Sequence, residues 1–113
     1  MDAHLGPFET QARDATSLLK AVANECRLLV LCYLAEEGEL SVGQLGERVA
    51  LSQSALSQHL AKLREERLVS TRKDAQTVYY RLCDPKAERL LVLLHDLFCP
   101  ELGRSESASG ERS

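Results

Sequence analysis

The stretch LSQSALSQHLAKLR, residues 51–64, constrains the fold of this chain more than any other. Leu56, Leu60 and Leu63 recur at helical spacing and predict a helix with one apolar face. Ser52 is the predicted N-cap, because a serine hydroxyl accepts a hydrogen bond from an unpaired amide of the first helical turn. The broad opposite face is polar, which suits a DNA major groove but is equally typical of a solvated surface helix.

The polar face of this predicted helix carries short hydrogen-bonding side chains, which are the groups that contact base edges and phosphates. Gln58 is the best candidate for a base edge, because its amide donates and accepts at once. His59 lies at the border of the apolar face, so we expect it to be half-buried. The full set of candidate DNA contacts on this helix is Ser52 (near a phosphate), Gln53, Ser54, Ser57, Gln58 and His59.

Three further helices are predicted before this stretch. Residues 10–23 carry apolar side chains at helical spacing, and residues 26–36 (CRLLVLCYLAE) are apolar on nearly all sides, as in a central buried helix that Gly38 ends. Ser41 caps a short third helix that runs through Val49. That helix and the stretch at residues 51–64 form a predicted helix-turn-helix.

The periodicity changes after Arg67. Residues 68–72 and 77–82 are rich in Val, Thr and Tyr and flank a turn at residues 73–76, which predicts a hairpin. A hairpin directly after a helix-turn-helix makes a winged helix, a mainly α (α+β) fold with the element order ααααββα; the alternative is an ordinary hairpin with a charged tip. The candidate DNA contacts of the wing are Arg72, Lys73, Gln76 and Thr77.

The last predicted helix starts at Asp84-Pro85 and stops at Pro100. Its leucines and Phe98 cover too much of its circumference for one small core, so we expect a homodimer that uses the first and last helices. The expected domain is therefore residues 10–100, preceded by a flexible segment at 1–9. The polar tail at residues 101–113 is expected to be disordered.

The formal net charge of −3 is unevenly distributed along the chain. Residues 52–81 hold six Lys/Arg and three Asp/Glu, or +3, whereas the remaining residues hold eight Lys/Arg and fourteen Asp/Glu, or −6. The positive charge lies where a DNA-facing surface needs it.

We find no signal peptide or membrane-spanning stretch and expect a cytoplasmic protein. No pattern indicates catalysis or a cofactor, so we do not expect an enzyme.

Two long strings, LLKAVANECRLLVLCYLAEEGELSVGQLGERV and LSQSALSQHLAKLREERLVSTRKDAQTVYYRL, resemble the ArsR/SmtB family of dimeric bacterial winged-helix repressors, and the likeness covers residues 15–100. The strings LCYL around Cys32 and LFCP around Cys99 resemble the sulfide-responsive subgroup typified by BigR, SqrR and YgaV. Two metal sites of the family lack a ligand here: the ELCV-type cysteine is Ser41, and the His two residues after Asp84 is Lys86.

The resemblance implies a repressor of a palindromic double-stranded operator that responds to reactive sulfur species, a persulfide or polysulfide. It implies that Cys32 and Cys99 become joined by a polysulfide or disulfide link, which releases the DNA. Three alternatives stay open: a zinc-type metal sensor using these cysteines and His95, a peroxide sensor, and a winged helix that binds only proteins. Cys26 and Cys83 are expected to be small buried hydrophobes.

Overall fold

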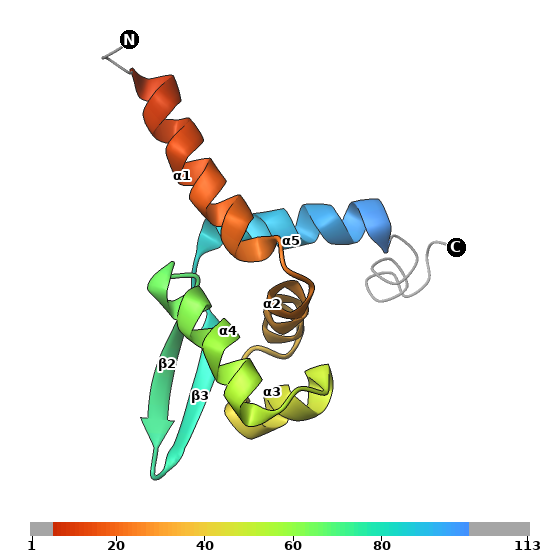
Figure 1. The fold of residues 1–113 in the computed structure, drawn as a ribbon. Helices are drawn as coiled ribbons and strands as arrows, with labels where there is room; N and C mark the ends of the chain where they lie inside the picture. Colours follow the sequence, from red (N-terminus) through yellow and green to blue (C-terminus); the bar gives the residue numbers. More distant parts are fainter. Residues whose placement is uncertain (1–5, 100–113) are drawn as a thin grey trace. The chain divides into compact units, whose positions relative to one another are not determined.

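The computed structural model describes residues 6–99, and it has the expected winged helix-turn-helix fold (Figure 1). The chain divides after Cys83 into two compact units, and the second unit contains α5. The predicted stop at Pro100, the predicted disordered tail and residues 1–5 lie outside the described residues. The elements are α1 (Pro7–Val22), α2 (Glu25–Glu37), β1 (Leu40–Ser41), α3 (Val42–Val49), α4 (Gln53–Glu65), β2 (Val69–Asp74), β3 (Thr77–Leu82) and α5 (Pro85–Phe98).

The helix starts follow the capping residues in the sequence. The Ser52 hydroxyl accepts a hydrogen bond from the Ala55 amide at 3.2 Å, as predicted for the N-cap of α4. Ser41 caps α3 in a reciprocal capping box with Gln44, whose side chain accepts from the Ser41 amide at 2.8 Å. Gly38 ends α2 with a φ of +88°, a conformation that favours glycine.

The core of the first unit lies between α2, α4 and the base of the wing. Leu31 and Leu34 on the central helix α2 are 0% and 1% exposed, and the predicted apolar face of α4 is equally buried. This one-sided burial fixes the rotation of α4 and leaves its other face to solvent. The buried apolar residues of this unit are Ala21, Val22, Val30, Leu31, Leu34, Leu40, Leu45, Leu56, Leu60, Leu63, Leu68 and Val69.

The sheet has one strand more than the sequence predicted. The two-residue strand β1 pairs antiparallel with β3, at Leu40↔Tyr80 and Ser41↔Tyr79, and gives the strand order β1-β3-β2. Two residues are too few to show an alternating pattern, so the order ααααββα omitted this strand. Its pairing joins the start of α3 to the wing.

The wing turn is also shorter than predicted. Asp74 pairs directly with Thr77, so the turn consists of Ala75 and Gln76 rather than residues 73–76. Ala75 has a φ of +59°, which a two-residue hairpin turn requires so that its twist matches that of the strands. No glycine marks this turn, which is why the sequence did not locate it.

Helix α1 begins at Pro7, three residues before the expected start at residue 10, because proline fits the first helical position. Its C-terminal end is anchored on α2 by Arg27, whose guanidinium donates to the carbonyls of Ala21 at 2.6 Å and Lys20 at 3.2 Å. A cation at this helix end also complements the helix dipole. Most of α1 nevertheless remains exposed.

We predict that Leu60→Ala lowers the free energy of unfolding by about 2–5 kcal/mol, because the side chain is 1% exposed and leaves a cavity. The matched control on the same helix is Ser57→Ala, whose exposed hydroxyl should change stability by less than about 0.5 kcal/mol. Urea unfolding at one fixed protein concentration measures both values. Equal effects of the two substitutions would contradict the buried face assigned to α4.

Candidate nucleic-acid interface

The exposed face of α4 brings together all six candidate contacts from one helix. Ser52, at the cap, and Gln53, Ser54, Ser57 and Gln58 are exposed, whereas His59 is half-buried, as its position at the edge of the apolar face predicted. The Ser52 oxygen already accepts the capping hydrogen bond, which leaves its hydroxyl proton for a phosphate. The helix thus presents amide and hydroxyl groups on a rigid support, and such groups read base edges.

The four candidate contacts of the wing do not form one surface. Successive side chains of a strand point to opposite faces, and the register places Arg72 opposite Tyr79 and Lys73 opposite Val78. Arg72 therefore shares a face with Thr77, while Lys73 lies on the other face and Gln76 sits in the turn. All four residues are exposed.

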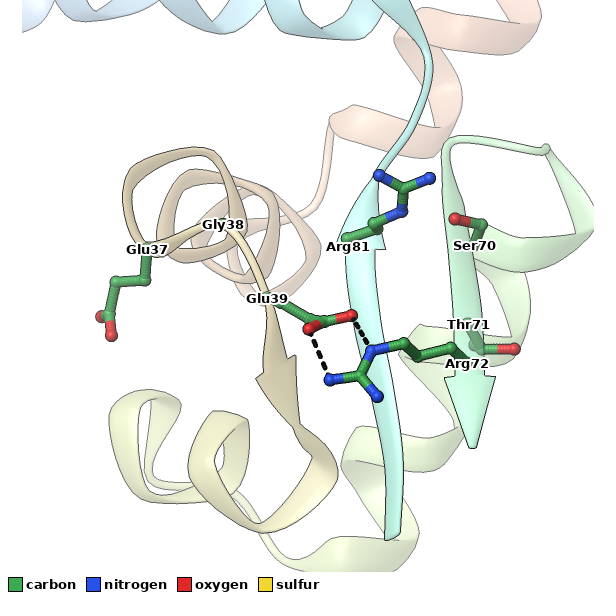
Figure 2. Close-up of a pocket in the computed structure, with 7 residues that line it drawn as sticks. All are labelled: Glu37, Gly38, Glu39, Ser70, Thr71, Arg72 and Arg81. Atoms are coloured by element: carbon green, nitrogen blue, oxygen red, sulfur yellow. Dashed lines mark hydrogen bonds and ion pairs between the residues drawn. The ribbon is translucent and has the colours of Figure 1, made fainter. Parts of the chain in front are cut away.

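Arg72 is held by the protein itself (Figure 2). Its guanidinium donates two hydrogen bonds to the carboxylate of Glu39, at 2.7 and 3.0 Å, and lies 4.5 Å from the centroid of the Tyr79 ring. These hydrogen bonds lower the pKa of Glu39 below 4.5 and raise the pKa of Arg72. The positive charge of Arg72 is thus balanced by a carboxylate before any DNA is present.

A second ion pair of the same geometry is formed by Glu37, two residues before Glu39. Arg48 of α3 donates to both carboxylate oxygens of Glu37, at 2.8 and 2.9 Å, and this lowers the pKa of Glu37. Glu37 and Glu39 flank Gly38, and Figure 2 shows their side chains extending in different directions from it. An open groove lies between this connection and the wing. It is lined by Glu37, Gly38, Glu39, Ser70, Thr71, Arg72 and Arg81.

Sequence reasoning missed both ion pairs. The partners Glu37 and Arg48 are 11 residues apart, and Glu39 and Arg72 are 33 residues apart. No helical or strand periodicity connects residues at such separations, so only the folded chain shows these pairs.

The cysteines occupy different environments. Cys32 is half-buried on α2, and Cys99 is the half-buried C-cap of α5, where its amide donates to the His95 carbonyl at 2.8 Å. The expectation of burial for the other two was wrong: Cys26 is half-buried at the start of α2 and Cys83 is exposed. Cys83 lies in the connection after β3, where its sulfur is 3.7 Å from the Arg67 carbonyl oxygen.

Two other features, a metal-binding cluster and a membrane-spanning helix, are absent from residues 6–99. No group of three or more His, Cys, Asp and Glu side chains in this range is arranged to hold a metal ion. None of the helices in the same range has the length and apolar character needed to cross a bilayer.

A capped helix with a polar exposed face, preceded by α3 and followed by a hairpin, defines a winged-helix DNA-binding protein. A sequence model described as "Bacterial regulatory protein, arsR family" matches residues 24–71, from the cap of α2 into β2. The chain is also 53% identical over 96 residues to the transcriptional activator HlyU of Vibrio cholerae, covering 85% of this chain and 88% of that protein. The chain belongs to the arsR family of bacterial transcriptional regulators.

Solved structures agree with this assignment. Reduced HlyU from Vibrio cholerae has a TM-score of 0.79 and 54% identity, covering 84% of this chain and 99% of that one. The transcriptional repressor BigR from Xylella fastidiosa has a TM-score of 0.76 and 39% identity, covering 81% and 93%. Regulators of the family bind DNA and usually act as dimers, and the relatives are named as regulators rather than enzymes.

We predict that replacing both carboxylates, Glu37→Gln with Glu39→Gln, lowers stability most at pH 7. A carboxyl whose pKa is lowered on folding stabilises the protein above its unfolded pKa of about 4.5, and this contribution is lost as the pH falls through the lowered value. The difference in urea midpoint between wild type and variant should therefore shrink below pH 4.5. Glu36→Gln, on the exposed surface of α2, is the matched control; a difference that does not change with pH would contradict the prediction.

Proposed function

We propose that this protein is a dimeric repressor that binds a palindromic operator and releases it when reactive sulfur species link Cys32 to Cys99. The observation that supports sequence-specific DNA binding is the exposed polar face of α4, which the buried leucines of the same helix hold in place. Gln53, Ser54, Ser57 and Gln58 contact bases or adjacent phosphates, Ser52 contacts a phosphate, and His59 contacts DNA from the edge of the face. Lys73, Gln76 and Thr77 contact DNA from the wing.

Exposed apolar side chains support dimerisation through α1 and α5. On α1, Phe8 is 84% exposed and Leu19 is 54% exposed. On α5, Val92, Leu93, Leu97 and Phe98 are between 51% and 76% exposed. Two copies that cover these surfaces by two-fold symmetry present two α4 helices to half-sites about one DNA turn, ~34 Å, apart.

The proposed switch uses the sulfane sulfur as the oxidant. A cysteine thiolate takes sulfur from a persulfide donor RSSH and releases RS⁻, which leaves a protein persulfide. A persulfide and a thiol then form a disulfide and release H₂S, whereas two persulfides form a trisulfide and release H₂S. Cys32 and Cys99 are both half-buried, and neither forms a disulfide in the structure. The solved relative described as reduced HlyU supports redox chemistry in this family.

The link acts on DNA binding through the dimer. Cys32 lies on α2, whose N-terminal end holds α1 through Arg27, and Cys99 caps α5. A covalent bond between α2 and α5 restrains α5 directly and α1 through its anchor on α2, and α1 and α5 are the helices that carry the exposed apolar surfaces. The spacing of the two α4 helices then no longer matches the half-sites, and affinity falls.

Gln58→Ala tests the reading of DNA by α4. We predict a loss of about 1–3 kcal/mol in operator binding, together with relaxed preference at one base pair per half-site, because an amide fork specifies one base edge. The operator is selected from a random DNA library, and affinities are measured by fluorescence anisotropy. Gln11→Ala, the same chemical change on the exposed surface of α1, is the control; equal losses in both variants would refute the contact.

Cysteine variants test the switch. We predict that polysulfide releases operator DNA from wild type and from the Cys83→Ser control. A disulfide link lowers the intact mass by two hydrogens, and a trisulfide link raises it by one sulfur less two hydrogens. Cys32→Ser and Cys99→Ser should keep their DNA, because neither can close the link. Release from either variant, or release by zinc or by peroxide without added sulfur, would overturn the proposed signal.

A further inference from the structure

The connection Glu37-Gly38-Glu39 holds two arginines from two different parts of the DNA-binding unit, and Figure 2 shows the pair of Glu39 with Arg72. Glu37 binds Arg48 of α3, which belongs to the helix-turn-helix, and Glu39 binds Arg72 of β2, which belongs to the wing. Both pairs are bidentate, the arrangement in which an arginine and a carboxylate fix each other's orientation.

The backbone of this connection explains how adjacent carboxylates reach partners on separate elements. Gly38 has a φ of +88°, a conformation that side-chain-bearing residues rarely adopt, and it turns the chain between the end of α2 and β1. β1 follows immediately and pairs with β3 of the wing, while Ser41 at its end caps α3. The same few residues thus contact both DNA-binding elements.

We propose that Glu37 and Glu39 form a clamp that sets the orientation of the wing relative to the helix-turn-helix, with Arg48 and Arg72 as its positioning residues. In this arrangement Arg72 does not contact phosphate. Its guanidinium is hydrogen-bonded to Glu39, lies over the face of Tyr79 and is 4.0 Å from the carboxylate of Asp74. Its side chain lies on the opposite face of the hairpin from Lys73. The wing cation that binds phosphate is Lys73.

The clamp and a phosphate contact make different predictions for salt dependence. Each phosphate contact contributes about 0.9 to the slope of log K against log[salt], because counterions are released when a phosphate is neutralised. A residue that only positions the wing changes affinity and leaves this slope unchanged. The inference rests on the proposed contact of the wing with DNA, so the experiment tests that contact separately.

The test measures operator affinity from low to high KCl for Glu39→Gln, Glu36→Gln and Lys73→Gln. We expect Glu39→Gln to weaken binding by about threefold to fivefold, the upper end for one exposed ion pair, with an unchanged salt slope. Glu36→Gln removes the same charge three residues earlier on the exposed surface of α2, and it should leave affinity unchanged or slightly higher. Lys73→Gln should lower the slope by about 0.9.

Exchanging the charges of Glu39 and Arg72 tests whether operator affinity depends on the ion pair between them rather than on which residue carries which charge. The double variant Glu39→Arg with Arg72→Glu restores the ion pair in reverse, but the new charges face Asp74 and Arg81, so it should recover part of the affinity lost in Glu39→Gln. Tighter binding and a steeper slope in Glu39→Gln would overturn the proposal, because Glu39 would then only mask a DNA-binding Arg72. An effect equal to that of Glu36→Gln would overturn it as well.

Hydrogen exchange of the wing amides, residues 69–82, separates failure of the clamp from failure of the wing contact. If Lys73→Gln leaves the slope unchanged, the wing contact is wrong, and the clamp is judged on the DNA-free protein. Faster exchange in Glu39→Gln than in Glu36→Gln then supports the clamp. Equal exchange in these two variants overturns it.

Discussion

Burial of one face of α4 is the constraint on which the DNA-binding unit depends. Leu56, Leu60 and Leu63 are at most 1% exposed, and burying each contributes about 1.5–3 kcal/mol relative to leaving it in water. Because this face cannot leave the core, the helix cannot rotate about its axis, and the polar side chains opposite it are held outward. The orientation that DNA reading requires is therefore a consequence of apolar packing rather than of the polar residues themselves.

Features that depend on neighbouring residues could be predicted from the sequence. The caps at Ser41 and Ser52 and the leucine face of α4 are set within one or two helical turns, and the structure has all of them. The short strand β1 and the turn at Ala75 could not be predicted, because each is set by pairing with a strand elsewhere in the chain. The same reason applies to the pairs that Glu37 and Glu39 make across 11 and 33 residues.

In the candidate site, too, the features set by neighbouring residues could be predicted and those set by distant residues could not. The sequence predicted which candidate residues of α4 are exposed, since exposure follows directly from helical periodicity, and it predicted the half-burial of His59. For the wing it treated Arg72 and Lys73 as equivalent cations. Strand alternation and the carboxylate of Glu39 make them different: one is paired within the protein, and the other is exposed on the opposite face. Residue type alone carries no information about such pairing.

The pairing of Arg72 also bears on the proposed control of DNA binding through the dimer. The segment of residues 52–81 has a formal charge of +3, but Glu39, outside it, neutralises one of its cations. The DNA-binding segment of a single copy therefore has only a small positive charge, within a chain of net charge −3. The sequence-independent electrostatic attraction between one copy and the DNA phosphates is weak for this reason. Tight binding then requires two α4 helices at the correct spacing. In the proposed switch, a Cys32–Cys99 link that changes this spacing by a small amount releases the operator without altering any of the proposed DNA contacts.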